Sequence, residues 1–259
     1  MSKAFLAISL LTTAGIAASC GTVDPGFSPP VLRGQYEMVA ASTVSPGSLV
    51  LVEVNFTQTG ASVVANKSNV VLIQADQPPS LPMVLSRFGG VCDNEIPGND
   101  FLQGAFSSAT QLSLGVTEAG ALGNGILTGN ATVSADGSQI TNGTYASPAQ
   151  CGYVADNGNL TGVKIKSFSG RYAGRISNPS GTDLVIVTMN QTGFNLTVSG
   201  TDNGTAFTLT GTVVGATFDV AGSIAGRSVR YVGLYNHVTD EFRVFDPSLA
   251  FLGVLQGGT

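Results

Sequence analysis

Charged side chains are scarce in this chain of 259 residues, since Asp, Glu, Lys and Arg together make up only 10% of it. Lys and Arg form no cluster anywhere, and the formal net charge is −5. Proteins that bind nucleic acid need concentrated basic residues to neutralise phosphates. The sequence therefore predicts that nucleic acid is not a partner.

Histidine is almost absent as well, since His237 is the one copy in the chain. A single histidine excludes the common metal sites that need several imidazoles. His237 stands in the turn-like stretch Asn236-His-Val-Thr-Asp240, and no Gly-x-Ser-x-Gly or other nucleophile signature is present. We therefore predict no catalytic residue, no metal and no cofactor. A buried carboxylate pair, or a contact between His237 and a carboxylate in a cleft, would instead favour a hydrolase.

No stretch keeps a helical period, yet hydrophobic residues make up 43% of the chain, which argues against disorder. Apolar and polar residues alternate instead in short runs, for example at Val50, Val52 and Val54, and again at Phe207 and Leu209. Turn signals recur every 8 to 12 residues toward the C-terminus, and about eight strands fit between residues 168 and 255. These features predict an all-β protein, either an antiparallel up-and-down barrel or a sandwich.

One pattern occurs twice. Gly34-Gln-Tyr36 is followed, after a turn, by an apolar strand that ends in Gln58-Thr-Gly60. Gly170-Arg-Tyr172 is followed in the same way by a strand that ends in Gln191-Thr-Gly193. The repeat indicates an internal duplication and favours two tandem β-units over one large barrel.

Three Gly-containing tetrads or triplets predict tight turns between strands. They are Ala135-Asp-Gly-Ser138, Asp156-Asn-Gly158 and Asp202-Asn-Gly204. Residues 77–100 contain four prolines and predict a long loop, with a short strand over Met83–Phe88. The acidic residues of this loop do not follow the spacing of an EF-hand, so we expect a solvated loop without calcium.

The first residues are typical of an export segment. Lys3 precedes an apolar run, Ala4–Ala18, that is too short for a comfortable membrane span. The run ends in Ile16-Ala-Ala-Ser-Cys20-Gly, which resembles the lipobox of a bacterial lipoprotein precursor. The resemblance covers only this segment and implies lipidation of Cys20 and anchoring at the periplasmic face or outer membrane. Ala17 stands where the family usually has leucine, and ordinary cleavage after Ser19 would instead give a secreted protein.

With Cys20 lipidated, Cys92 and Cys151 remain as an even pair in an oxidising compartment, which predicts a disulfide. A closed loop of about 60 residues would stabilise the fold by about 4 kcal/mol. The expected layout is a signal peptide (residues 1–19), a Pro- and Gly-rich tether (20–30), a first β-unit with a disulfide-stapled loop (31–165) and a second β-unit (166–259).

Basic residues of the second unit offer one ligand hypothesis. Arg171 and Arg175 share a strand face, and Arg230 lies on a later strand. If these arginines point into a barrel, they can hold an anionic ligand. Tyr172 and Ile176 form the more apolar side of the same strand, so an outward position is favoured.

The leading functional expectation is a non-catalytic lipoprotein of the cell envelope with a structural or binding role. The alternatives are a β-barrel carrier of a small apolar or anionic ligand and, least favoured, an envelope hydrolase. A lumen filled by large side chains would remove the carrier hypothesis.

Overall fold

The structure is a computed structural model that describes residues 26–66, 69–76, 84–87, 101–117, 127–147, 155–178 and 181–258. In these ranges the regular elements are antiparallel strands, and no α-helix is present among them. None of the described residues belongs to a helix that could cross a bilayer. The all-β prediction is confirmed.

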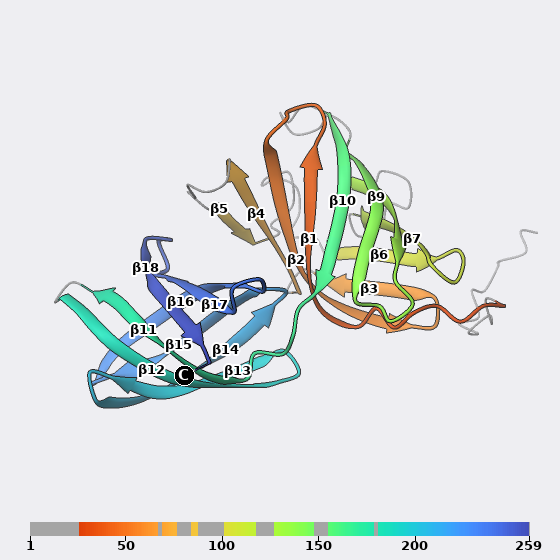
Figure 1. Cartoon of the computed structure of the whole chain (residues 1–259). Coiled ribbons are helices and arrows are strands. Elements are labelled where there is room, and N and C mark those ends of the chain that lie inside the picture. The colour runs from red at the N-terminus through yellow and green to blue at the C-terminus, as the bar shows by residue number, and fades with distance from the viewer. Residues whose placement is uncertain are drawn as a thin grey trace, which may run out of the picture.

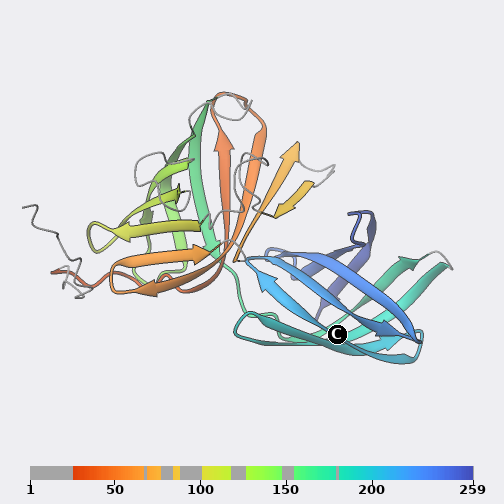
Figure 2. The same ribbon diagram turned by 180° about the vertical axis from the view of Figure 1, so that it is seen from behind.

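The first unit is a closed barrel of eight strands with a two-stranded extension (Figures 1 and 2). The ring runs β1-β10-β9-β8-β7-β6-β3-β2 and closes because β1 pairs with both β10 and β2. In the extension, β4 pairs with the first half of β2, and β5 pairs with the other edge of β4. The strands are β1 (Gly34–Ser42), β2 (Ser48–Thr59), β3 (Ser62–Asn66), β4 (Val70–Asp76), β5 (Val84–Arg87), β6 (Phe101–Phe106), β7 (Gln111–Thr117), β8 (Leu127–Val133), β9 (Gln139–Ser147) and β10 (Asp156–Lys164).

The second unit is a closed up-and-down barrel of eight strands that pair in sequence order, with β11 also pairing with β18. Closure removes the exposed strand edges that a chain with few charged residues would otherwise present. The strands are β11 (Gly170–Asn178), β12 (Gly181–Thr192), β13 (Asn195–Asp202), β14 (Thr205–Val214), β15 (Thr217–Ile224), β16 (Arg227–Asn236), β17 (Glu241–Phe245) and β18 (Phe251–Gly257).

The repeated sequence pattern corresponds to a repeated structure. The side-chain carbonyl of Gln58 accepts the N–H of Leu32 (2.5 Å), and that of Gln191 accepts the N–H of Phe168 (2.7 Å). Each glutamine also donates to the glycine carbonyl two residues later. The same residues therefore tie the same segments together in both barrels, and the prediction of two related β-units is confirmed.

Each barrel has its own apolar interior. In the strands whose side-chain burial is described, alternate residues point inward, as the patterns at Val54 and Phe56 and at Phe207 and Leu209 predicted. One end of each barrel is closed by the residue two positions before its first strand, Leu32 in the first barrel and Phe168 in the second, both 0% exposed. We call this the closed end of each barrel and the opposite one the open end.

Two of the three predicted turns are correct. Residues 134–138 join β8 to β9, and Asn203 and Gly204 join β13 to β14 with φ of 45° and 85°. The third prediction is wrong, because Asp156 and Gly158 lie inside β10. The physical reason for this glycine is packing, since a Cβ on Gly158 would lie 1.9 Å from the carbonyl oxygen of Ala41 on the neighbouring strand.

Candidate functional site

The closed end of the second barrel is joined to the outer wall of the first by buried polar side chains. Gln35, Glu53 and Asn55 point outward from β1 and β2, yet they are only 5%, 0% and 0% exposed. The backbone that covers them is the turn between β14 and β15, residues 213–217, which we call the docking turn. The two views place this turn against the first barrel (Figures 1 and 2).

The docking turn is held through its main-chain groups. Asn55 donates to the carbonyl of Val213 (2.6 Å) and accepts the N–H of Gly215 (2.9 Å). Gln35 donates to the carbonyl of Gly215 (2.9 Å), and Glu53 Oε2 accepts the N–H of Ala216 (2.5 Å). Buried backbone groups that would cost free energy if left unpaired are therefore satisfied by the first barrel.

Gly215 permits this approach for two reasons. Its φ of 54° is in the left-handed region that favours glycine. A Cβ at this position would also lie 2.3 Å from Glu53 Oε2 and 2.6 Å from the carbonyl oxygen of Tyr36. No other residue type fits here without moving the two barrels apart.

Glu53 lies directly across the ladder from Glu37, and the two carboxyl groups interact. Burial raises the pKa of Glu53 well above its usual range, and the charge of Glu37 raises it further. Burial also raises the pKa of Glu37, against the lowering effect of nearby His237. Glu53 Oε1 is buried and has no partner at normal hydrogen-bond length within the described ranges. The pair therefore favours a proton on Glu53.

His237 completes this cluster from the turn between β16 and β17. Its Nδ1 lies 3.6 Å from Glu37 Oε1, and its side chain is 38% exposed. The two residues border a crevice of about 250 Å³ between β1, β9, β10 and the His237 turn. This is the contact between His237 and a carboxylate that favours a hydrolase. No serine, threonine or cysteine in the described part of the chain hydrogen-bonds to His237, so a triad is not assembled there.

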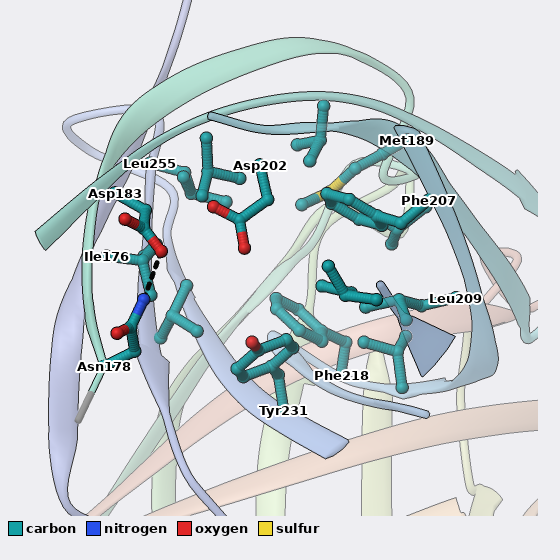
Figure 3. Close-up of a pocket in the computed structure, with 16 residues that line it drawn as sticks. Ile176, Asn178, Asp183, Met189, Asp202, Phe207, Leu209, Phe218, Tyr231 and Leu255 are labelled. Atoms are coloured by element: carbon teal, nitrogen blue, oxygen red, sulfur yellow. Dashed lines mark hydrogen bonds between the residues drawn. The ribbon is translucent and has the colours of Figure 1, made fainter. Parts of the chain in front are cut away.

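The open end of the second barrel leads into an apolar lumen (Figure 3). Side chains of all strands fill most of it and leave a cavity of about 50 Å³. Drug-sized ligands need about 300–1,000 Å³. The lumen therefore has no room for a large carried molecule.

Two carboxylates, Asp183 and Asp202, stand at this open end, with Asn178 and Tyr231 beside them (Figure 3). Asp183 accepts hydrogen bonds from the amides of Asn178 and Asn203. Asp202 Oδ1 is buried and has no hydrogen-bond partner among the described residues. Burial raises the pKa of Asp202, the charge of Asp183 and a side-chain hydrogen bond with Asp183 raise it further, and the charge of Arg227 lowers it.

The arginines singled out from the sequence do not line this lumen. Arg171 and Arg175 are exposed on the outer face of β11, opposite the buried Tyr172 and Ile176. Arg230 is also exposed and binds Asp219 through two hydrogen bonds, 2.8 and 2.6 Å long. The structure does not bring the three arginines together in one site.

The predicted lipidation site Cys20 and the predicted disulfide partners Cys92 and Cys151 lie outside the described residues. The strands that flank the last two can still be compared. β6, which follows Cys92 in the sequence, begins at the open end of the first barrel, and β9, which precedes Cys151, ends there. The disulfide stays a prediction.

Sequence reasoning missed the buried outward-facing residues of β1 and β2. Gln35, Glu53 and Asn55 occupy the polar positions of alternating strands, which normally face solvent. Nothing in the alternation distinguishes a polar residue facing water from one covered by a second barrel. The Gly in Val214-Gly215-Ala216 was the one available signal, and it indicates only a turn.

These features define the class of the protein: a tandem β-barrel protein with a polar, buried junction. No cluster of three or more potential metal ligands occurs among the described residues. No family model, curated protein or solved structure matches the chain.

Proposed function

We propose that the protein is a non-catalytic lipoprotein of the cell envelope that acts as a binding module. In this proposal Cys20 carries the lipid, residues 20–30 space the folded body from the membrane, and the two barrels form the module. The observation that carries the proposal is the junction. It holds the second barrel by its closed end, so that the open end points away from the junction, as a binding module needs.

Three features support a non-catalytic role. His237 has a carboxylate neighbour, Glu37, but no nucleophile bonded to it in the described ranges. Glu53 is fully buried beneath the docking turn and cannot reach a substrate. Asp183 and Asp202 stand over an apolar cavity of about 50 Å³, which is too small for a sugar between two carboxylates.

The anchoring part of the proposal is tested by native mass spectrometry on protein purified from its own envelope, together with the variant Cys20→Ala. The expected result is a mass increment of a diacylglyceryl group and an N-acyl chain on the wild type, and release of Cys20→Ala from the membrane fraction. The same spectrum reports the Cys92–Cys151 bond as a loss of two hydrogen masses. A wild-type protein that starts after Ser19 without lipid would contradict the anchor.

A further inference from the structure

The open end of the second barrel combines two neighbouring carboxyl groups with an apolar cavity. Asp183 is held by two neutral amides, and Asp202 Oδ1 is buried with no hydrogen-bond partner among the described residues. Neither carboxylate takes part in an ion pair within the described ranges, and Arg227 is the one cation whose charge acts on Asp202. A buried carboxylate oxygen without a partner is costly, so this position is suited to a ligand that donates a hydrogen bond.

The cavity below these carboxylates is small and apolar. Its volume of about 50 Å³ exceeds the 10–15 Å³ or so that one water needs. However, the wall beneath the open end is built from apolar side chains such as Val185, Val187 and Phe207, which give water no hydrogen bonds. Apolar cavities of this kind accept hydrocarbon in preference to water. The space fits a short alkyl group.

We propose that the open end of the second barrel binds a small alkylammonium ion, with the alkyl group in the lumen and the ammonium group between Asp183 and Asp202. This inference rests on the proposed binding role and names its ligand class. An ammonium group supplies three donors, one of which reaches the unpaired Asp202 oxygen. An anion would be repelled by both carboxylates, and a neutral alkane would leave that oxygen unpaired.

The first barrel offers an internal comparison for this site. Its open end carries Asp156, but both oxygens of that carboxylate are already bonded, to Ser42 (2.6 Å) and to Tyr145 (2.7 Å). These bonds lower the pKa of Asp156, whereas the pKa of Asp202 is raised. Asp156 is therefore a structural acceptor with both oxygens bonded, in contrast to Asp202, whose Oδ1 has no hydrogen-bond partner among the described residues.

The experiment is saturation-transfer NMR on the purified full chain with isobutylammonium as the probe. Isobutanol and isovalerate are the matched neutral and anionic probes of similar shape. We expect transfer to the methyl groups of isobutylammonium in the millimolar range and much weaker transfer to the other two. The ammonium group could belong to a small free amine or to the N-terminus of a peptide. A peptide that begins with valine distinguishes these two sources. If it binds more tightly than isobutylammonium, the ligand is a peptide N-terminus.

Two variants locate the site. Asp202→Asn removes the charge and should weaken isobutylammonium binding by about tenfold or more. Val185→Phe fills the cavity next to Asp202 in the strand ladder and should abolish transfer to the methyl groups, while its melting curve shows whether the fold is kept. Asp219→Asn is the matched control, because this carboxylate lies on the outer wall and binds Arg230.

Equal binding of isobutanol and isobutylammonium would overturn the proposal, as would unchanged binding in Asp202→Asn. The proposal would also be overturned if no saturation transfer reached any of the amine probes. None of these results affects membrane anchoring, which is measured separately through Cys20→Ala. Failure of the ligand class and failure of the lipoprotein assignment are therefore distinguishable.

Discussion

The two barrels share one plan and differ at one end. At the closed end of each barrel a glutamine, a glycine two residues later and a buried apolar residue recur, although that apolar residue is Leu32 in the first barrel and Phe168 in the second. At the open end of the second barrel, β13 and β14 are joined by Asn203 and Gly204 alone, whereas residues 67–100 separate the equivalent strands β3 and β6 of the first. The first barrel therefore has a long connection where the second has a two-residue turn.

The closed ends also differ in one functional respect. Among the described residues, Gln58 bonds within the first barrel: its side chain bonds to the backbone of residues 30, 32 and 60, and its main-chain carbonyl accepts from the Arg33 side chain. Gln191 also donates to Gln35 Oε1 of the first barrel (2.5 Å). The closed end of the second barrel thus serves twice, as the base of its own core and as part of the junction. The following tests separate these roles, from the largest expected effect to the smallest.

The largest effect is expected from the residue that closes each barrel. Phe168 packs against Tyr235 and Phe242 with ring centroids 5.3 and 4.8 Å away. Phe168→Ala should lower the free energy of unfolding by about 3–5 kcal/mol, because it leaves a cavity and removes the aromatic contacts. Hydrogen exchange read by mass spectrometry should show faster exchange in the second barrel only. The matched variant Leu32→Ala should affect the first barrel, and faster exchange in both barrels for either variant would contradict the two separate cores.

The junction is tested with a pair of glycines. Gly215→Ala should cost about 2–4 kcal/mol, since it adds both backbone strain and a clash with Glu53 and Tyr36. Gly226→Ala is the control, with φ of 78° and no atom within 4 Å of the added Cβ. It should cost about 1–2 kcal/mol from strain alone. Small-angle scattering should show a larger radius of gyration for Gly215→Ala only, and equal dimensions for the two variants would show that the docking turn does not hold the barrels together.

The paired glutamines give a smaller effect. Gln58→Ala and Gln191→Ala each leave buried backbone groups unpaired and should each cost about 1–3 kcal/mol. Gln191→Ala should cost more because it also removes the bond to Gln35. Chemical denaturation measures both. A double variant of Gln191 and Gln35 that is simply additive would show that the bond across the junction contributes nothing.

The pH dependence of the junction should be the mildest effect. The pKa values of Glu53 and Glu37 are both raised in the folded state. Their contribution to stability is therefore complete below the ordinary glutamate pKa of about 4.3 and is lost as the pH rises through the raised values. We expect the melting temperature to fall with rising pH across this window, by about 2–4 °C for each kcal/mol lost.

Glu53→Gln keeps the acceptor for the Ala216 N–H and removes the charge. It should flatten that pH profile without separating the barrels. Glu241→Gln, in a partly exposed ion pair with Arg243, is the control and should leave the slope unchanged. A steeper profile in Glu53→Gln would mean that Glu53 is ionised in the folded protein.

Local patterns were sufficient to predict the strands and the duplication. The alternation at Val54 and Phe56 and the Asn203-Gly204 turn each depend on a few neighbouring residues, so the sequence contains the information directly. The turn predicted at Asp156-Asn-Gly158 was wrong because the reason for the glycine is not local. Gly158 is required there by the close approach of Ala41 on β1, which is a contact between residues far apart in sequence.

The junction and the open-end carboxylates were not predictable by the same reasoning. From the sequence, Asn55 is predicted to face solvent on β2, but in the structure the docking turn covers it. Asp202 is predicted only as the first residue of a turn, but in the structure it interacts with Asp183. Both depend on which strands meet, and strand alternation does not specify the pairing of distant segments.

The connection between β3 and β6 also bears on the order in which the chain folds. In the second barrel every neighbouring pair except the closing one is a hairpin, so each pairing step joins residues that are close in sequence. In the first barrel β3 must find β6 across residues 67–100, which adds loop-closure entropy to the search. The acceptor for the docking turn needs only the β1–β2 hairpin. We therefore expect the second barrel to fold first and to bind the β1–β2 hairpin through the docking turn. The first barrel, which folds more slowly, would then close while it is already bound to the second.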